Sequence, residues 1–373
     1  MIVGRIAVPN KLSLRRLAVA VAVTALTVSP AQLTSAQEAR PANGSIEPDG
    51  TVVVPSFRLP PSIYLSEEAK KALPRTPTDQ MAPLAGIIAA GQTGAMRQRM
   101  PQIVAPRLNK LKEMYKVSTR DAEIAGVPAV YAAPAGGVPK ANAKKIMLNL
   151  PGGGFVMGVA GGTGMMESIP LAGLAGVEIV SITYRQGPEH VYPAATEDVV
   201  KVYRELLKSH KPENIAIFGC SAGGMLTAQA MAAFTREKLP LPAAIGIFCA
   251  SADARWGGDS RAFGRPFEAL PPREDGPAYF KGVNLTDPMV SPVLSPETLK
   301  RFPPTLIVTG TRAFEMSAAV NTHRELVKAG ATADLHMWDG LGHAFFYDPA
   351  LPESREAFDV MTGFFRKHLK LVQ

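Results

Sequence analysis

The chain has 373 residues, of which 46% are hydrophobic and 19% are charged, and it contains two cysteines. This composition is typical of a globular protein, because it is too apolar for intrinsic disorder and too poor in cysteine for a disulfide-stapled scaffold. The formal net charge is +8, but Arg5, Lys11, Arg15 and Arg16 all precede the first acidic residue, Glu38. The small basic excess of the remaining chain is spread along it and does not indicate nucleic-acid or lipid-surface binding.

The N-terminus has the pattern of an export signal. A basic segment is followed by an apolar run at 17–28, and the small residues Thr34, Ser35 and Ala36 offer a cleavage site. The apolar run is too short to span a bilayer, which needs about 20 residues. We therefore expect residues 1–36 to be a cleaved signal peptide and the mature chain to be periplasmic or secreted, with an uncleaved anchor as the alternative. No other apolar stretch predicts stable membrane insertion.

The segments after the signal predict a linker and a helical cap. Residues 37–62 are rich in proline, glycine and serine, which is typical of a linker. Residues 63–118 contain two helical patterns, at 64–73 and at 101–115, and the second has a proline in its expected first turn. We interpret residues 63–118 as a helical cap.

Residues 119–373 predict an α/β core. A polar–apolar alternation at 119–133 indicates a β-hairpin, and short apolar runs then alternate with amphipathic helices at 196–210 and 353–369. This alternation of strands and helices is typical of a mostly parallel sheet with helices on both faces. The segment 256–288 interrupts it and is expected to add to the cap. The parallel strands are expected at 146–150, 178–184, 215–218, 244–249, 305–309 and 333–338.

One pentapeptide contains the candidate nucleophile. G-C-S-A-G at 219–223 follows an expected strand directly and precedes an apolar helix that starts near Ala222. A sharp strand-to-helix turn strains the backbone of its central residue and needs small flanking residues, and the helix N-terminus favours developing negative charge. The context predicts that Ser221 is a nucleophile for acyl transfer. The alternative is a glycine-rich turn without a catalytic role.

A serine hydroxyl needs a base, and His343 is the candidate. It lies in the glycine-containing loop 340–345, after the last expected strand and before the last helix, from which an imidazole can reach back over the sheet. The other histidines are interpreted as surface, core or structural side chains. They are His190, His210, His323, His336 and His368.

A glycine run provides candidate donors for an oxyanion. P-G-G-G-F at 151–155 follows the strand expected at 146–150. The backbone N–H groups of Gly153 and Gly154, with that of Ala222, are expected to form an oxyanion hole. A phosphate-binding loop is the alternative, and it would suit a nicotinamide oxidoreductase. The full G-x-G-x-x-G pattern with a later acidic residue is absent from the sequence, which disfavours that interpretation.

Over residues 119–369 the chain resembles the hormone-sensitive-lipase branch of the α/β-hydrolase esterases. Five motifs carry the resemblance: P-G-G-G-F at 151–155, Y-R-Q-G-P-E-H at 184–190, G-C-S-A-G-G at 219–224, Asp287-Pro288 with Ser291-Pro292, and Gly342-His343. The resemblance implies an α/β-hydrolase fold with an N-terminal helical cap and hydrolysis of small carboxylic esters through an acyl-enzyme. It implies neither a metal nor an organic cofactor.

Two positions depart from the family pattern. Pro151 stands where the family's H-G-G-G motif has its histidine, and Ala313 stands where the family places the acid of its triad. That acid orients the histidine, and its loss lowers kcat about 10⁴-fold in well-studied triads. Glu315, two positions further on, is the leading substitute. Asp253, Asp339 and the absence of any acid are the alternatives.

These departures leave two functions open. The chain is expected to be a serine esterase for short-chain or otherwise small acyl groups. The alternative is a degenerate hydrolase that binds an apolar ligand or a partner without turnover. The sequence indicates neither the natural substrate nor the oligomeric state.

The only two thiols are placed close together by the expected strands. Cys220 lies in the pentapeptide and Cys249 ends the next strand. Adjacent strands lie about 4.8 Å apart, so export would permit a disulfide. Two buried free thiols are the preferred interpretation, because a thiol packs like a small hydrophobic group.

Overall fold

The computed structural model divides into two compact units, residues 1–60 and 61–373. In the first unit, β1 (Ser45–Ile46) and β2 (Val52–Val53) form an antiparallel pair within the expected linker. The predicted signal peptide lies outside the described residues. The residues that the structure describes are 44–54, 58–73, 82–263 and 278–372.

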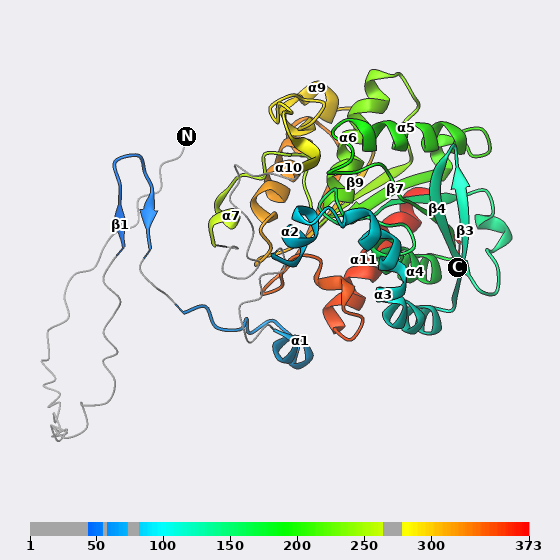
Figure 1. The fold of residues 1–373 in the computed structure, drawn as a ribbon, viewed down its shortest axis with the longest axis horizontal. Helices are drawn as coiled ribbons and strands as arrows, with labels where there is room; N and C mark the ends of the chain where they lie inside the picture. Colours follow the sequence, from blue (N-terminus) through cyan, green and yellow to red (C-terminus); the bar gives the residue numbers. More distant parts are fainter. Residues whose placement is uncertain (1–43, 55–57, 74–81, 264–277, 373) are drawn as a thin grey trace, which may run out of the picture. The chain divides into compact units, whose positions relative to one another are not determined.

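The second unit is built on an eight-stranded sheet of order β10-β9-β8-β7-β5-β6-β4-β3 (Figure 1). The neighbouring pairs from β10 to β6 are parallel, whereas β4 pairs antiparallel with both β6 and β3. The predicted fold class, an α/β hydrolase with a mostly parallel sheet, is confirmed. The strands are β3 (Val117–Ile124), β4 (Val127–Pro134), β5 (Ile146–Leu150), β6 (Glu178–Ile182), β7 (Ile215–Cys220), β8 (Ala244–Phe248), β9 (Thr305–Gly310) and β10 (Ala333–Trp338).

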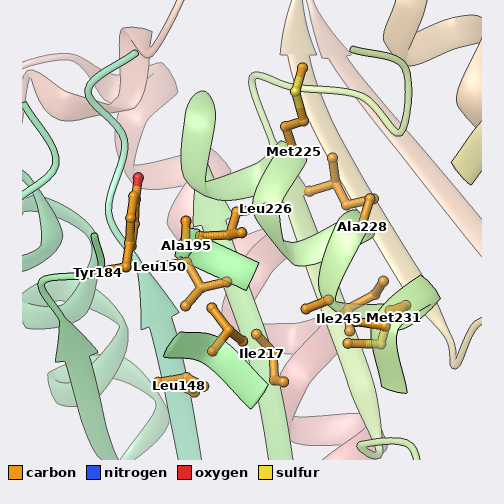
Figure 2. Close-up of a cluster of buried hydrophobic side chains, with 14 of the residues drawn as sticks. Leu148, Leu150, Tyr184, Ala195, Ile217, Met225, Leu226, Ala228, Met231 and Ile245 are labelled. Carbon is orange, nitrogen blue, oxygen red and sulfur yellow. The ribbon is translucent and has the colours of Figure 1, made fainter. Parts of the chain in front are cut away.

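Two apolar cores lie on opposite faces of the sheet. Along β5, Leu148 and Leu150 belong to one core and Met147 to the other, because side chains alternate along a strand. Figure 2 shows Leu148 and Ile217 from the sheet beneath Leu226 of α6. Each of these side chains is fully buried, and such burial contributes about 1.5–3 kcal/mol per side chain. Residues of α5 (Ala194–Leu206), α6 (Ala222–Arg236) and α10 (Met316–Lys328) line the first core, and residues of α3 (Thr93–Tyr115), α4 (Thr163–Ala175) and α11 (Pro352–Leu369) line the second.

Two helices differ from the sequence-based expectation. Helix α3, in the segment expected to form a cap, begins at Thr93, so Pro101 and Pro106 lie inside it and not at its start. The extra turns are held by Thr93 and Arg97, which bond to loop residues far away in sequence, and a local pattern does not contain such contacts. Helix α4 was not predicted. Its residues are almost all buried, so no polar face produces the alternation that marks a surface helix.

The remaining elements of the expected cap are short. They are α1 (Glu67–Ala72), α2 (Ala82–Ala89), α7 (Asp259–Phe263) and the 3-10 turn Ala278–Phe280. The short helix α9 (Pro296–Leu299) lies outside the expected cap. Part of the segment 256–288 lies outside the described residues. No helix in the described part of the chain has the length and apolar character needed to cross a bilayer.

Helix α6 and strand β5 approach each other at Gly223. A Cβ atom there would lie 1.7 Å from the carbonyl oxygen of Leu150, which is backbone and cannot rotate away. We expect Gly223→Ala to lower the free energy of unfolding by about 3 kcal/mol or more, measured by urea titration.

The matched control is Gly363→Ala, an exposed glycine in α11 whose added Cβ would meet no atom within 4 Å. This variant should be more stable than the parent by about 0.5–1 kcal/mol, because alanine is the better helix former. Equal stability of the Gly223→Ala variant and the parent would contradict the close approach.

Candidate active site

Ser221 occupies the strained turn between β7 and α6. Its backbone has φ 58° and ψ −125°, a conformation that costs a residue with a side chain about 1–3 kcal/mol. The Ser221 N–H donates to the carbonyl oxygen of Phe248 at 2.8 Å. A Cβ on Gly219 would lie 2.2 Å from the oxygen of Leu150. The turn is therefore held by backbone packing on both sides, and glycine is required there.

The glycine loop after β5 lies beside Ser221. A Cβ on Gly152 would lie 3.2 Å from the Ser221 Cβ, so the loop backbone passes directly beside the serine. Gly153 and Gly154 have φ 141° and 62°, and a Cβ on Gly153 would lie 2.5 Å from the nitrogen of Gly158. The glycines at 152–154 are thus needed for the path of the loop. Ala222, the third predicted donor, is the first residue of α6.

Residues of the Y-R-Q-G-P-E-H segment brace this loop, a role that the sequence analysis did not assign. The Tyr184 hydroxyl donates to the carbonyl oxygen of Pro151 at 2.6 Å. Gln186 exchanges two hydrogen bonds of 2.8 Å with the backbone of Gly158. Burial raises the pKa of Tyr184, so its hydroxyl remains a donor. These bonds hold the loop although Pro151 replaces the family's histidine.

Helix α3, in the segment expected to form a cap, is attached to the same loops by Arg97. Its guanidinium donates to the carbonyl oxygens of Val156 at 2.7 Å and Gly187 at 3.1 Å, and it forms an ion pair with Glu189. The Thr93 hydroxyl donates to the same Glu189 carboxylate at 3.0 Å. One charged side chain thus links the start of α3 to two loops of the site.

His343 and Glu315 lie in contact. The Nδ1 atom of His343 is 3.0 Å from Oε2 of Glu315, and the Thr309 hydroxyl donates to the other carboxylate oxygen at 3.1 Å. Glu315 is 2% exposed, whereas the His343 side chain is 23% exposed. The His343 and Phe314 rings pack with centroids 4.7 Å apart. A buried carboxylate beside Nδ1 favours the tautomer that keeps the proton on Nδ1.

The other candidate acids have different partners. Both carboxylate oxygens of Asp253 accept from the Arg255 side chain at 2.8 Å. Asp339 accepts from the Thr311 hydroxyl at 3.0 Å. Ala313, at the family's acid position, is fully buried. The geometry thus favours Glu315, which lies at the N-terminal cap of α10 and reaches His343 through its longer side chain.

The two cysteines are free thiols, and both are buried. The Ala344 N–H, next to His343, donates to the Cys249 sulfur at 3.2 Å. Burial, together with its contact with Cys220, raises the pKa of the Cys249 thiol. The thiol of Cys249 is therefore part of the packing that holds the histidine loop.

A buried carboxyl group lies behind the serine turn, and the sequence analysis missed it. Glu167 of α4 is fully buried, and it accepts hydrogen bonds from the Tyr347 hydroxyl at 2.7 Å and from Asn149 at 3.1 Å. Burial raises its pKa well above the ordinary glutamate value. A lone acid within the apolar stretch 163–175 was the available signal.

The Glu167 environment predicts a pH-dependent stability difference. The folded chain binds this proton more tightly than the unfolded chain, so the stabilisation is complete below the ordinary pKa of 4.5 and is lost as the pH rises towards the folded-state pKa. We expect the unfolding free energy of the parent to fall relative to that of Glu167→Gln, by about 1.4 kcal/mol per pH unit. Urea titrations of both proteins across this range provide the measurement, and a pH-independent difference would contradict it.

The comparisons with known proteins agree with the fold. A family model described as alpha/beta hydrolase fold matches residues 147–347. The chain therefore belongs to the α/β-hydrolase family. It is 31% identical over 228 residues to an acetyl-hydrolase of Streptomyces hygroscopicus, across 60% of this chain and 75% of that protein. An esterase of Acinetobacter venetianus is 24% identical over 232 residues, across 60% and 76% of the two chains.

Solved structures of esterases are similar to the chain. It superposes on the crystal structure of esterase E25 with a TM-score of 0.72 and 29% identity, covering 85% of this chain and 98% of that one. An esterase of the bacterial hormone-sensitive lipase family gives a TM-score of 0.63 at 28% identity, covering 73% and 98%. The expected resemblance to α/β-hydrolases of the carboxylesterase type is confirmed.

Proposed function

We propose that the chain hydrolyses small carboxylic esters through an acyl-enzyme on Ser221. The observation that carries the proposal is the pairing of His343 with a buried carboxylate, Glu315, in a fold whose strained serine turn lies beside a glycine loop. The relatives that are named acetyl-hydrolase and esterase support ester hydrolysis and favour a short acyl group.

The residues suit the two halves of this reaction. Nε2 of His343 accepts the proton of the Ser221 hydroxyl as its oxygen attacks the ester carbonyl carbon. The N–H groups of Gly153, Gly154 and Ala222 stabilise the oxyanion. His343 then protonates the leaving alcohol. In the second half, His343 takes a proton from a water molecule, which attacks the acyl-enzyme and releases the acid. Throughout, Glu315 orients the imidazole and stabilises its charged form.

The contacts of the site support hydrolysis over the competing function, binding without turnover. It was suggested by the loss of two family side chains. Glu315 contacts His343 in place of an acid at Ala313. Tyr184 and Gln186 brace the loop that Pro151 begins. No observation in the described residues favours a non-catalytic role over hydrolysis.

Replacement of the nucleophile provides the direct test. We expect Ser221→Ala to lower kcat for p-nitrophenyl acetate by about 10⁴-fold or more, because alanine has no hydroxyl with which to form the acyl-enzyme. An active-site phosphonate should add one mass equivalent to the parent and to the neighbouring control Cys220→Ala, and none to Ser221→Ala. Hydrolysis at the parental rate by Ser221→Ala would rule out the proposed nucleophile.

Replacement of the acid tests how His343 is oriented. Glu315→Gln keeps the side-chain shape and removes the charge, so kcat should fall by about 10³–10⁴-fold with little change in KM. The matched control Asp339→Asn, in the loop before His343, should retain kcat within about threefold, because its carboxylate bonds to Thr311.

The variant Ala313→Asp gives the complementary result. If Glu315 already serves as the acid, restoring an acid at the family position should raise kcat little. A large gain from Ala313→Asp together with a silent Glu315→Gln would show that Glu315 is not the acid.

A further inference from the structure

Three side chains with metal-binding atoms meet after consecutive strands of the sheet. Cys249 follows β8, Glu315 follows β9 and His343 follows β10. One ligand atom from each lies within 4.8 Å of the other two. We propose that Cys249, Glu315 and His343 form an inhibitory binding site for a Zn²⁺ ion. The inhibition rests on the proposed function, whereas the binding does not.

The ligand set is one that zinc prefers. Zn²⁺ binds thiolate sulfur at about 2.3 Å and imidazole nitrogen or carboxylate oxygen at about 2.0–2.2 Å, which places tetrahedral ligand atoms about 3.3–3.7 Å apart. The Nδ1 and Oε2 atoms of His343 and Glu315 are 3.0 Å apart, so small side-chain shifts admit the ion. A sulfur ligand disfavours Mg²⁺ and Ca²⁺, which take oxygen. Water can complete the tetrahedron.

The surroundings are suited to hold such ligands. The Thr309 hydroxyl binds one oxygen of Glu315, which directs the other towards His343. The Ala344 N–H donates to the Cys249 sulfur and would stabilise its thiolate. Partners of this kind orient metal ligands. Cys249 and Glu315 are buried, and the partly exposed His343 ring provides the entry side for an ion.

Metal binding and catalysis exclude each other at His343. Coordination forms bonds from zinc to Nδ1, to a Glu315 oxygen and to the Cys249 sulfur, whose thiol releases its proton to solvent. The Nδ1 proton leaves for solvent, and Nε2 takes one up, so the neutral ring keeps a single proton. Nε2 then carries hydrogen and cannot accept the Ser221 proton. The zinc ion also withdraws Glu315 from the imidazole. The loaded chain should be inactive, and a chelator should restore it.

Cobalt provides a test of binding that needs no activity. The full chain, reduced and metal-free, is titrated with Co²⁺, and a sulfur-to-cobalt charge-transfer band should rise to one equivalent. Cys249→Ala and Cys249→Ser should lose the band, with folding checked by circular dichroism. Cys220→Ala, which removes the neighbouring thiol outside the cluster, should keep it. No band in the parent, or a band that persists without Cys249, would overturn the site.

Hydrolysis tests the inhibition. Zn²⁺ should inhibit p-nitrophenyl acetate hydrolysis by the parent reversibly with EDTA, and the half-inhibiting concentration should rise about 10–100-fold in Cys249→Ala, relative to that variant's own metal-free rate. If the band forms but zinc leaves hydrolysis unchanged, the inhibitory role is wrong. If the band forms in a chain that hydrolyses no ester, the proposed function fails and the metal site stands.

Discussion

The backbone contact between Leu150 and the two glycines of the serine turn is the constraint on which the site depends. The Leu150 oxygen lies so close to Gly219 and Gly223 that a side chain at either would overlap it. This contact joins β5, β7 and α6 and holds Ser221 at φ 58°. The glycine loop starts from the same end of β5, so the serine and the loop are positioned by one packing arrangement.

The second half of the site depends on a substitution that moves an acid along the chain. In the resembled family the acid stands at the position of Ala313, which is buried here, whereas Glu315 at the N-terminal cap of α10 contacts His343. The longer glutamate side chain compensates for the shifted backbone position. A similar exchange occurs around Pro151, where Tyr184 and Gln186 provide hydrogen bonds to the loop. The site is thus maintained through contacts and not through the identity of single residues.

The region behind the reacting groups contains titratable and polar side chains as well as apolar ones. Cys249 borders the histidine loop, and Glu167 lies buried beneath the serine turn with Tyr347 and Asn149. Burial of the charged form of a carboxyl group is costly for folding, and burial accordingly raises the pKa of Glu167. Both groups contact the segment around His343, Cys249 through the Ala344 N–H and Glu167 through the Tyr347 hydroxyl.

The sequence by itself determined the order of strands along the chain, the serine turn and the class of fold, because these follow from local patterns: apolar runs, and glycines around one serine. It did not determine the partner of His343, since Glu315, Asp253 and Asp339 are all near strand ends and only three-dimensional packing separates them. Helix α4 and the true start of α3 were missed for the same reason. A helix that is buried on almost all sides has no amphipathic period, and Arg97 stabilises the first turns of α3 through residues far away in sequence.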